Sequence, residues 1–176
     1  IKKHLDLTSG RDRGRLYRIV HEGFTQPAIP KLSKTPTAEL VPLLAHKNAW
    51  HSETAARLIY ERQDKSIVPA LENLAKNCPS ELGRKNALYA LGTLGALTPK
   101  HVLLGLTDTS PLVRANTVKL AEGFVKDANV LAKLVSMASD DNSLVRYQLA
   151  YTLGDALDPN AYSALVALAK KDAADK

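Results

Sequence analysis

The sequence is poor in several residue types, and each scarcity excludes a class of protein. Its 176 residues include one cysteine, Cys78, which excludes internal disulfides and any metal or haem site built from several cysteines. No apolar run approaches the roughly 20 residues that a membrane-spanning helix needs, so we expect no membrane insertion. The histidines are scattered, and no two are spaced i, i+4 to share a helical face, so we expect neither a metal nor a cofactor.

Basic residues exceed acidic ones, but the excess is local. Residues 1–34 hold 8 Lys/Arg against 3 Asp/Glu, whereas residues 35–176 hold 16 against 15. A nucleic-acid groove needs several cations along one face to neutralise phosphates. The charge distribution therefore argues against nucleic acid as a partner of residues 35–176.

Residues 1–34 differ in pattern from the rest of the chain. Glycines interrupt them, residues 15–20 read as one short strand, and the prolines that follow favour an extended connector. A lone strand leaves both of its edges unpaired. We therefore expect residues 1–34 to be the basic end of an upstream domain with its connector, and residues 35–176 to be a separate domain. Because the chain starts at Ile1 and not at methionine, we expect it to be part of a longer protein.

From residue 37 onward the sequence repeats itself. Equivalent segments begin at His51, Gly83, Val113 and Val145. Their second positions, which we call the aligned site, are 32, 30 and 32 residues apart: Ser52, Arg84, Arg114 and Arg146. The apolar residues recur at helical spacing within each repeat. The pattern predicts an all-α solenoid with helix pairs near 37–63, 65–97, 98–125 and 127–157 and a further helix near 158–171, about four and a half repeats in all.

Two helix types alternate along these repeats. Outer helices carry apolar residues three and four apart, and inner helices carry small or apolar residues three, four and seven positions after the aligned site. Ser66 and Asp158 are predicted N-caps, with Pro159 in the first helical turn. The residues two positions before the aligned site are also predicted to be buried, so that Trp50→Ala would destabilise the first repeat: Trp50, Leu82, Leu112 and Leu144.

The turns before the inner helices indicate a family. Asp108 precedes Arg114 by six residues, and Asp140 precedes Arg146 by six. This pattern resembles the HEAT repeat in its short bacterial form, which implies a right-handed α-α superhelix whose turn acids and arginines form a ladder. Arg84 occupies the same position one repeat earlier. Ser52 replaces the arginine in the first repeat and Asn77 replaces the acid in the second, so we expect the ladder to be weakest there.

A second resemblance lies at the front of the chain. Residues 1–7 and the segment from Gly10 to Ile19, followed by prolines and by Asn48-Ala49-Trp50-His51, are similar to the junction in planctomycete-type membrane-bound dehydrogenase domain proteins. In that family a β-propeller precedes HEAT repeats and a c-type cytochrome follows them, which implies an extracytoplasmic location. The sequence has no Cys-x-x-Cys-His haem site and none of the propeller's substrate residues, so no catalytic role transfers.

Two rows of inner-helix residues are the candidate partner-binding site. Positions two and five after the aligned site share a helical face, so stacking predicts two parallel rows on the concave side. The rows are either a solvated face without a ligand or a docking face for a protein partner or a flanking domain, with the tyrosines as the best contacts. They comprise Thr54, Asn86, Asn116 and Gln148, and Arg57, Tyr89, Lys119 and Tyr151.

No acid, base and nucleophile recur together in a pocket-like position, so the sequence predicts a non-catalytic scaffold or protein-interaction module. The alternatives are a HEAT-like DNA glycosylase or another nucleic-acid-binding protein that uses the concave face, and a phycobilin lyase. A glycosylase needs a cationic row with an acid in it, and only Arg57 and Lys119 are basic in these rows. A lyase needs a bilin pocket, of which the sequence gives no sign.

Overall fold

The computed structural model describes residues 18–25, 28 and 30–173, and the chain divides into two compact units, residues 1–30 and 31–176. In the first unit the described residues form a turn at Glu22 and Gly23, where Gly23 has a φ of +81°. Residues 18–20 have no regular secondary structure, so the predicted strand is wrong in this part. Its other residues, 15–17, lie outside the described ones. A strand needs a partner, and the described residues of this unit offer none.

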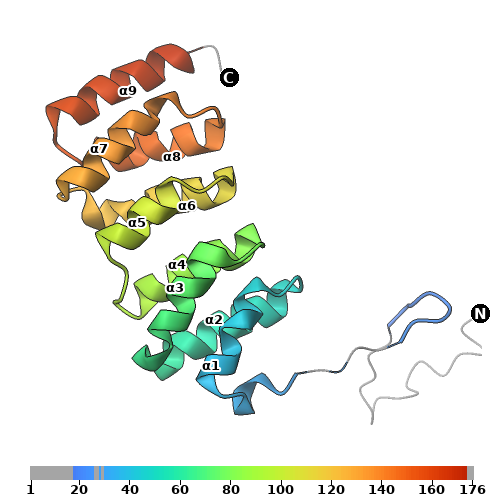
Figure 1. Ribbon diagram of the computed structural model, residues 1–176. Helices are drawn as coiled ribbons and strands as arrows, with labels where there is room; N and C mark the ends of the chain where they lie inside the picture. The colour runs from blue at the N-terminus through green and yellow to red at the C-terminus, as the bar shows by residue number, and fades with distance from the viewer. Residues whose placement is uncertain (1–17, 26–27, 29, 174–176) are drawn as a thin grey trace, which may run out of the picture. The chain divides into compact units, whose positions relative to one another are not determined.

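The second unit is a stack of helix pairs, drawn in Figure 1 from α1 to α9. The described residues of this unit contain helices and turns and no strand, which confirms the predicted all-α solenoid and the predicted helix pairs. The helices are α1 (Thr37–Leu40), α2 (Ala49–Arg62), α3 (Val68–Asn77), α4 (Glu81–Thr93), α5 (Pro99–Leu106), α6 (Pro111–Leu120), α7 (Ala128–Ser136), α8 (Ser143–Gly154) and α9 (Pro159–Lys171). Short 3₁₀ helices extend or precede them: η2 (Leu32–Lys34), η3 (Pro42–Ala45), η4 (Lys65–Ile67), η5 (Ala121–Phe124) and η6 (Met137–Ser139).

Polar caps fix where most helices begin. The side chains of Asn48, Asn142 and Asp158 accept hydrogen bonds from backbone amides in the first turns of α2, α8 and α9. Asp158 was predicted as a cap, with Pro159 following it, and both predictions are confirmed. Ser66 is not a cap: it lies inside η4, and the cap is Asp64, whose carboxylate accepts the Ser66 amide at 3.0 Å. An ionised carboxylate is the stronger acceptor at this position.

The first repeat begins before Thr37. Leu32 is 4% exposed and packs in the core, and the Arg62 guanidinium donates to the backbone carbonyls of Ser33 and Thr35. These contacts place residues 31–34 with the solenoid and not with the connector. The structure therefore draws the boundary between the two units at residue 30, four residues before the predicted end of the first segment.

The core lies between the two layers of helices. In the inner helices α4, α6 and α8, residues one position before and three and seven positions after the aligned site are buried, a four-residue spacing that follows one stripe of a helix. In α6 and η5 these residues are Val113, Thr117 and Ala121, and in α8 they are Val145, Leu149 and Leu153. Outer helices contribute Leu71, Val102, Leu106 and Leu134. In α9 the stripe is Ala161, Ala164 and Leu168, whereas the neighbouring Tyr162 is exposed.

The residues two positions before the aligned site are not in the core, and the prediction for them is wrong. Trp50, Leu82, Leu112 and Leu144 are 57%, 42%, 38% and 69% exposed. Each is the second residue of its helix and lies about 100° around the axis from the buried stripe, because successive helical residues rotate by that angle. These four apolar residues therefore occupy equivalent positions on the surface of the stack.

Candidate functional site

The first candidate, the ladder, is a chain of ion pairs that joins consecutive repeats. The Arg114 Nε and Nη2 atoms donate to the two carboxylate oxygens of Asp140 at 2.8 and 2.9 Å, and its Nη1 donates back to the carbonyls of Asp108 and Thr109. Arg84 bonds the Asp108 carboxylate at 2.7 and 2.8 Å in the same way, and its Nη1 donates to the Cys78 carbonyl. The planar guanidinium fork suits this double contact.

The turn acids of the ladder are held in their ionised form. Burial opposes ionisation of Asp108, but hydrogen bonds from Arg84 and from the Ser110 amide outweigh it, so its pKa is lowered. The pKa of Asp140 is lowered by the same balance, with Arg114 and the Asn142 amide as donors. Hydrogen bonding to the next acid raises the pKa of both Arg84 and Arg114. The ladder is therefore a set of half-buried charges whose partners are hydrogen-bonded.

The ladder extends further than the sequence prediction, and its missing contact lies between the first two repeats, where Ser52 and Asn77 replace the arginine and the acid. Arg146 pairs with Asp172 just after α9, with Nε 2.9 Å from Oδ2. The sequence could have indicated Asp172 as the partner of Arg146, because Asp172 follows Asp140 by the same 32 residues that separate Asp140 from Asp108. Each arginine bonds the acid of the following repeat, so Asn77 does not weaken the Arg84 contact. The missing contact is the one that Ser52 cannot make, since its hydroxyl bonds the Ala49 carbonyl.

The second candidate is a surface that we call the inner face. It consists of the residues two positions before and one, two and five positions after the aligned site in each inner helix, which follow one another at helical spacing. Neighbouring inner helices contact each other in the order α2, α4, α6, α8. The inner face comprises Trp50, Glu53, Thr54 and Arg57; Leu82, Lys85, Asn86 and Tyr89; Leu112, Ala115, Asn116 and Lys119; and Leu144, Tyr147, Gln148 and Tyr151.

Part of the predicted polar row links neighbouring repeats. Asn86 donates through Nδ2 to the Leu44 carbonyl of the previous repeat at 2.8 Å. Tyr89 donates to Oδ1 of Asn116 in the next inner helix at 3.0 Å, and Asn116 donates in turn to the Leu112 carbonyl. Burial raises the pKa of the Tyr89 hydroxyl, with the nearby Glu122 carboxylate adding to the effect. These three side chains have structural contacts and are the less available part of the inner face.

The remaining members of the row are more accessible. Arg57 is exposed and lies 3.7 Å from Glu61, and Lys119 is exposed. Tyr151 is 59% exposed, and its hydroxyl lies 2.9 Å from that of Tyr147, which is 63% exposed. Thr54 and Gln148 are half-buried. The tyrosine pair and the row of apolar residues at the helix starts form the apolar part of the inner face.

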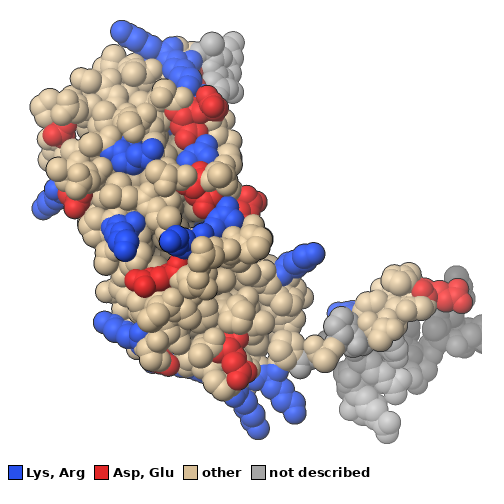
Figure 2. Space-filling model, in the orientation of Figure 1, with Lys and Arg blue, Asp and Glu red and all other residues tan. Residues whose placement is uncertain are grey.

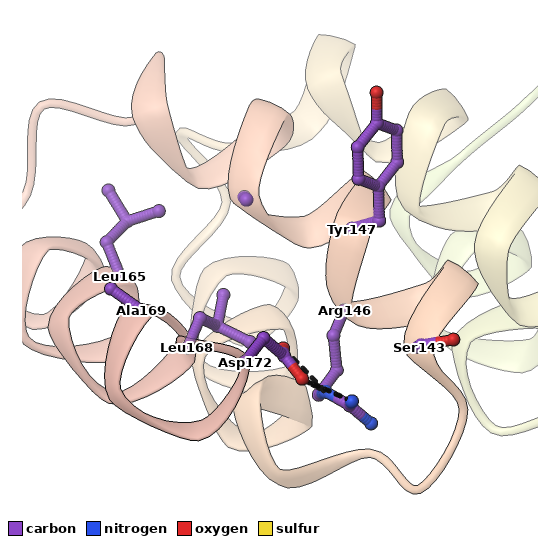
Figure 3. Close-up of a pocket in the computed structure, with 8 residues that line it drawn as sticks. Ser143, Arg146, Tyr147, Leu165, Leu168, Ala169 and Asp172 are labelled. Carbon is purple, nitrogen blue, oxygen red and sulfur yellow. Dashed lines mark hydrogen bonds and ion pairs between the residues drawn. The ribbon is translucent and has the colours of Figure 1, made fainter. Parts of the chain in front are cut away.

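Two hollows adjoin this surface. One lies between α6 and α8, has a cavity volume of about 310 Å³ and is lined by Leu112, Asn116, Lys119, Leu144 and Tyr147 among others. The other, shown in Figure 3, lies between α8 and α9 and has a volume of about 620 Å³. There Leu165 and Leu168 of α9 lie across from Tyr147 of α8, with the Arg146–Asp172 pair at one side. Both hollows are lined mainly by apolar side chains.

The described residues show no cluster of metal-ligating side chains. They contain no group of three or more histidine, cysteine, aspartate or glutamate side chains placed to hold a metal ion. His46 and His51 have ring centroids 4.6 Å apart, a contact that their spacing in the sequence does not indicate, but no carboxylate or thiol completes the pair. On the face drawn in Figure 2, basic and acidic residues alternate along one edge of the stack. None of the helices in the described part of the chain is long and apolar enough to cross a membrane.

Comparison with known proteins identifies the repeat class. The family model described as HEAT repeats matches residues 99–176, which include α5 to α9. That part of the chain is similar to HEAT repeats, and the second unit is a helical solenoid over its described residues. Searches of curated proteins and of solved structures found no match. The match suggests a helical repeat scaffold.

Proposed function

We propose that this solenoid is a non-catalytic docking scaffold and that its inner face binds a protein partner. The observation that supports this most directly is the row of apolar residues, Trp50, Leu82, Leu112 and Leu144, exposed at the start of four consecutive inner helices. A continuous exposed apolar surface on a protein commonly marks an interaction site. Aromatic residues contribute most to such interfaces, and Trp50, Tyr147 and Tyr151 supply them here.

The inner face is poorly suited to nucleic acid. Its cations are Arg57, Lys85 and Lys119, and Arg57 lies next to Glu61. Phosphate-backbone binding requires a series of cations whose contacts make affinity fall steeply with salt. The DNA glycosylase alternative also requires an acid within that series. Exposed apolar side chains at matching positions favour a protein ligand.

The larger context of this scaffold is also a proposal. The resemblance of residues 1–19 to the propeller–HEAT junction supports a role as a spacer or docking segment in a larger extracytoplasmic redox protein. Most of these residues lie outside the described ones, so this proposal is based on the sequence. Reading the complete gene tests it: we expect a propeller upstream and a Cys-x-x-Cys-His signature downstream, and their absence would refute the redox context.

The docking role can be tested by site-specific photo-crosslinking in the source cells. A photoreactive residue at Leu112 or Leu144 should give discrete adducts, because these side chains border the hollow between α6 and α8. The same residue at the exposed Ala132 of the outer helix α7 is the matched control and should give none. Equal labelling from both helix layers, or none from either, would contradict docking on the inner face.

A further inference from the structure

We propose that the inner face of α4, α6 and α8 binds an acidic segment in polyproline II conformation with an apolar residue at every third position. This inference rests on the proposed docking function and specifies its ligand. Three features of these inner helices support the proposed ligand: their spacing, their polar groups and their charges. The apolar contacts on the protein side are Leu82, Leu112 and Leu144, each the second residue of its helix.

The spacing of the helices favours this ligand. The helix α4 contacts α6, and α6 contacts α8. Packed helices lie about 8–10 Å apart, so equivalent residues recur at that distance across the stack. A polyproline II helix has three residues per turn and rises about 3.1 Å per residue, so every third side chain returns to the same side after about 9 Å. In a β-strand the same side returns after about 6.7 Å, which does not fit.

The hollow between α6 and α8 can receive one side chain of such a segment. Leu112 and Leu144 border it from adjacent helices, and Pro111, Ala115 and Tyr147 add to its apolar lining. Its volume of about 310 Å³ is large enough for a leucine or proline side chain. Covering Leu112 and Leu144, which are 38% and 69% exposed, removes apolar surface from water.

The polar groups beside this row suit an extended backbone. A polyproline II segment makes no internal hydrogen bonds, so its carbonyls and amides need partners. Gln148 lines the same hollow. Among the described residues Gln148 bonds through Nε2 alone, to Glu122 and Thr152, which leaves its Oε1 to accept from a ligand amide. An α-helical ligand satisfies its own backbone and would not use these groups.

The charges on these three helices select an acidic segment. Lys85 of α4 and Lys119 of α6 belong to the inner face, and α4, α6 and α8 contribute no acidic residue to it. Glu122 borders the face, where it accepts hydrogen bonds from Gln148 and Thr152. The helix α2 differs, because its part of the inner face includes Glu53. Acidic residues between the apolar ones would therefore lie near the two lysines.

Fluorescence anisotropy with the full chain tests this proposal. The probe is a labelled peptide of repeated Leu-Glu-Pro units, and the comparison peptides are Leu-Lys-Pro repeats and an amphipathic helix with leucine at every seventh position. We expect the Leu-Glu-Pro peptide to bind best. Leu112→Asp should weaken its binding at least about tenfold, because an apolar contact is lost and a like charge is added. Lys119→Glu should weaken it about tenfold and improve binding of the Leu-Lys-Pro peptide.

A matched control and the competing results make the outcome decisive. Lys100→Glu changes the same charge on the outer helix α5 and should leave the affinity unchanged. If the helical peptide binds best and Leu112→Asp still abolishes binding, the polyproline ligand is wrong while docking on the inner face stands. If Leu-Glu-Pro binding is absent, or is equally sensitive to Lys100→Glu and Lys119→Glu, the ligand assignment is also wrong. Failure of the docking function itself would appear in the crosslinking comparison.

Discussion

Each ladder arginine bonds the turn before its own helix and the acid that follows the next outer helix. The Arg114 guanidinium donates to two carbonyls of the turn before α6 and to the carboxylate of the turn before α8. Its side chain is 17% exposed and that of Asp140 is 9% exposed. A pair this sheltered differs from surface ion pairs, whose median contribution is close to zero. Its loss leaves several polar groups without partners.

We therefore expect Arg114→Lys to lower the free energy of unfolding by about 1–3 kcal/mol, although the charge is kept. A single ammonium group cannot reach the two carbonyls and both carboxylate oxygens, because it lacks the planar fork. Urea denaturation measures the change. The matched control is Arg57→Lys, whose side chain is 66% exposed, and it should be nearly neutral. Equal effects from the two substitutions would show that the fork geometry does not matter.

Trp50 gives a second prediction at the residue scale. Its side chain is 57% exposed, and its ring centroid lies 5.1 Å from that of His51 in an edge-to-face arrangement. Because little apolar surface is buried there, Trp50→Ala should change the unfolding free energy by less than about 0.5 kcal/mol, as surface substitutions do. Ile59→Ala in the same helix removes a fully buried side chain and should cost about 2–5 kcal/mol. A comparable loss of thermal stability in both variants would show that the Trp50 side chain contributes to the core after all.

At the scale of the helices, close approach depends on small residues. A methyl group added at Gly105 in α5 would overlap with the Thr117 side chain in α6, and it would lie 2.8 Å from a terminal carbon of Leu88 in α4. Thr117 is β-branched and 1% exposed, so it cannot rotate away without disturbing the core. The glycine therefore permits an outer helix to approach two inner helices.

Gly105→Ala should accordingly destabilise the protein by about 1–2 kcal/mol, despite the gain of about 1 kcal/mol in helix propensity. Gly154→Ala at the end of α8 is the matched control, since an added methyl group meets nothing within 4 Å. It should be neutral or stabilising. Thermal unfolding followed by circular dichroism compares the two. If Gly105→Ala were stabilising, propensity would outweigh packing at this contact.

The same scale shows what the sequence could predict. Helix pairs and most of the core followed from periodicity and from the step of about thirty residues, because repeated burial imposes a repeated pattern. The surface residues Leu82, Leu112 and Leu144 were assigned wrongly, since periodicity identifies shared character but not which side of a helix is covered. Predicting which acid each ladder arginine contacts requires the register between repeats. The spacing of Asp172 from Asp140 gives that register. The contacts of Asn86 and Asn116 depend on how neighbouring helices pack, so the sequence pattern does not indicate them.

For the whole molecule, stability is a sum over repeats and the interfaces between neighbours. The interface between the first two repeats has no arginine–carboxylate pair, because Ser52 occupies the arginine position. The later interfaces are joined by Arg84–Asp108, Arg114–Asp140 and Arg146–Asp172. Stability along the stack should therefore depend on pH most strongly in the later repeats.

The sign of that pH dependence follows from the turn acids. The pKa values of Asp108 and Asp140 are lowered in the folded state, so protons bind the unfolded chain more readily, and the stability from ionisation is lost as pH falls from about pH 5 through the folded pKa values. Asp140→Asn should be less stable than the parent at pH 7 and should approach it at low pH, as measured by urea midpoints. The control Asp141→Asn changes an exposed neighbouring carboxylate and should keep the parent's pH dependence. Parallel curves for Asp140→Asn and the parent would mean that the ladder does not cause acid unfolding.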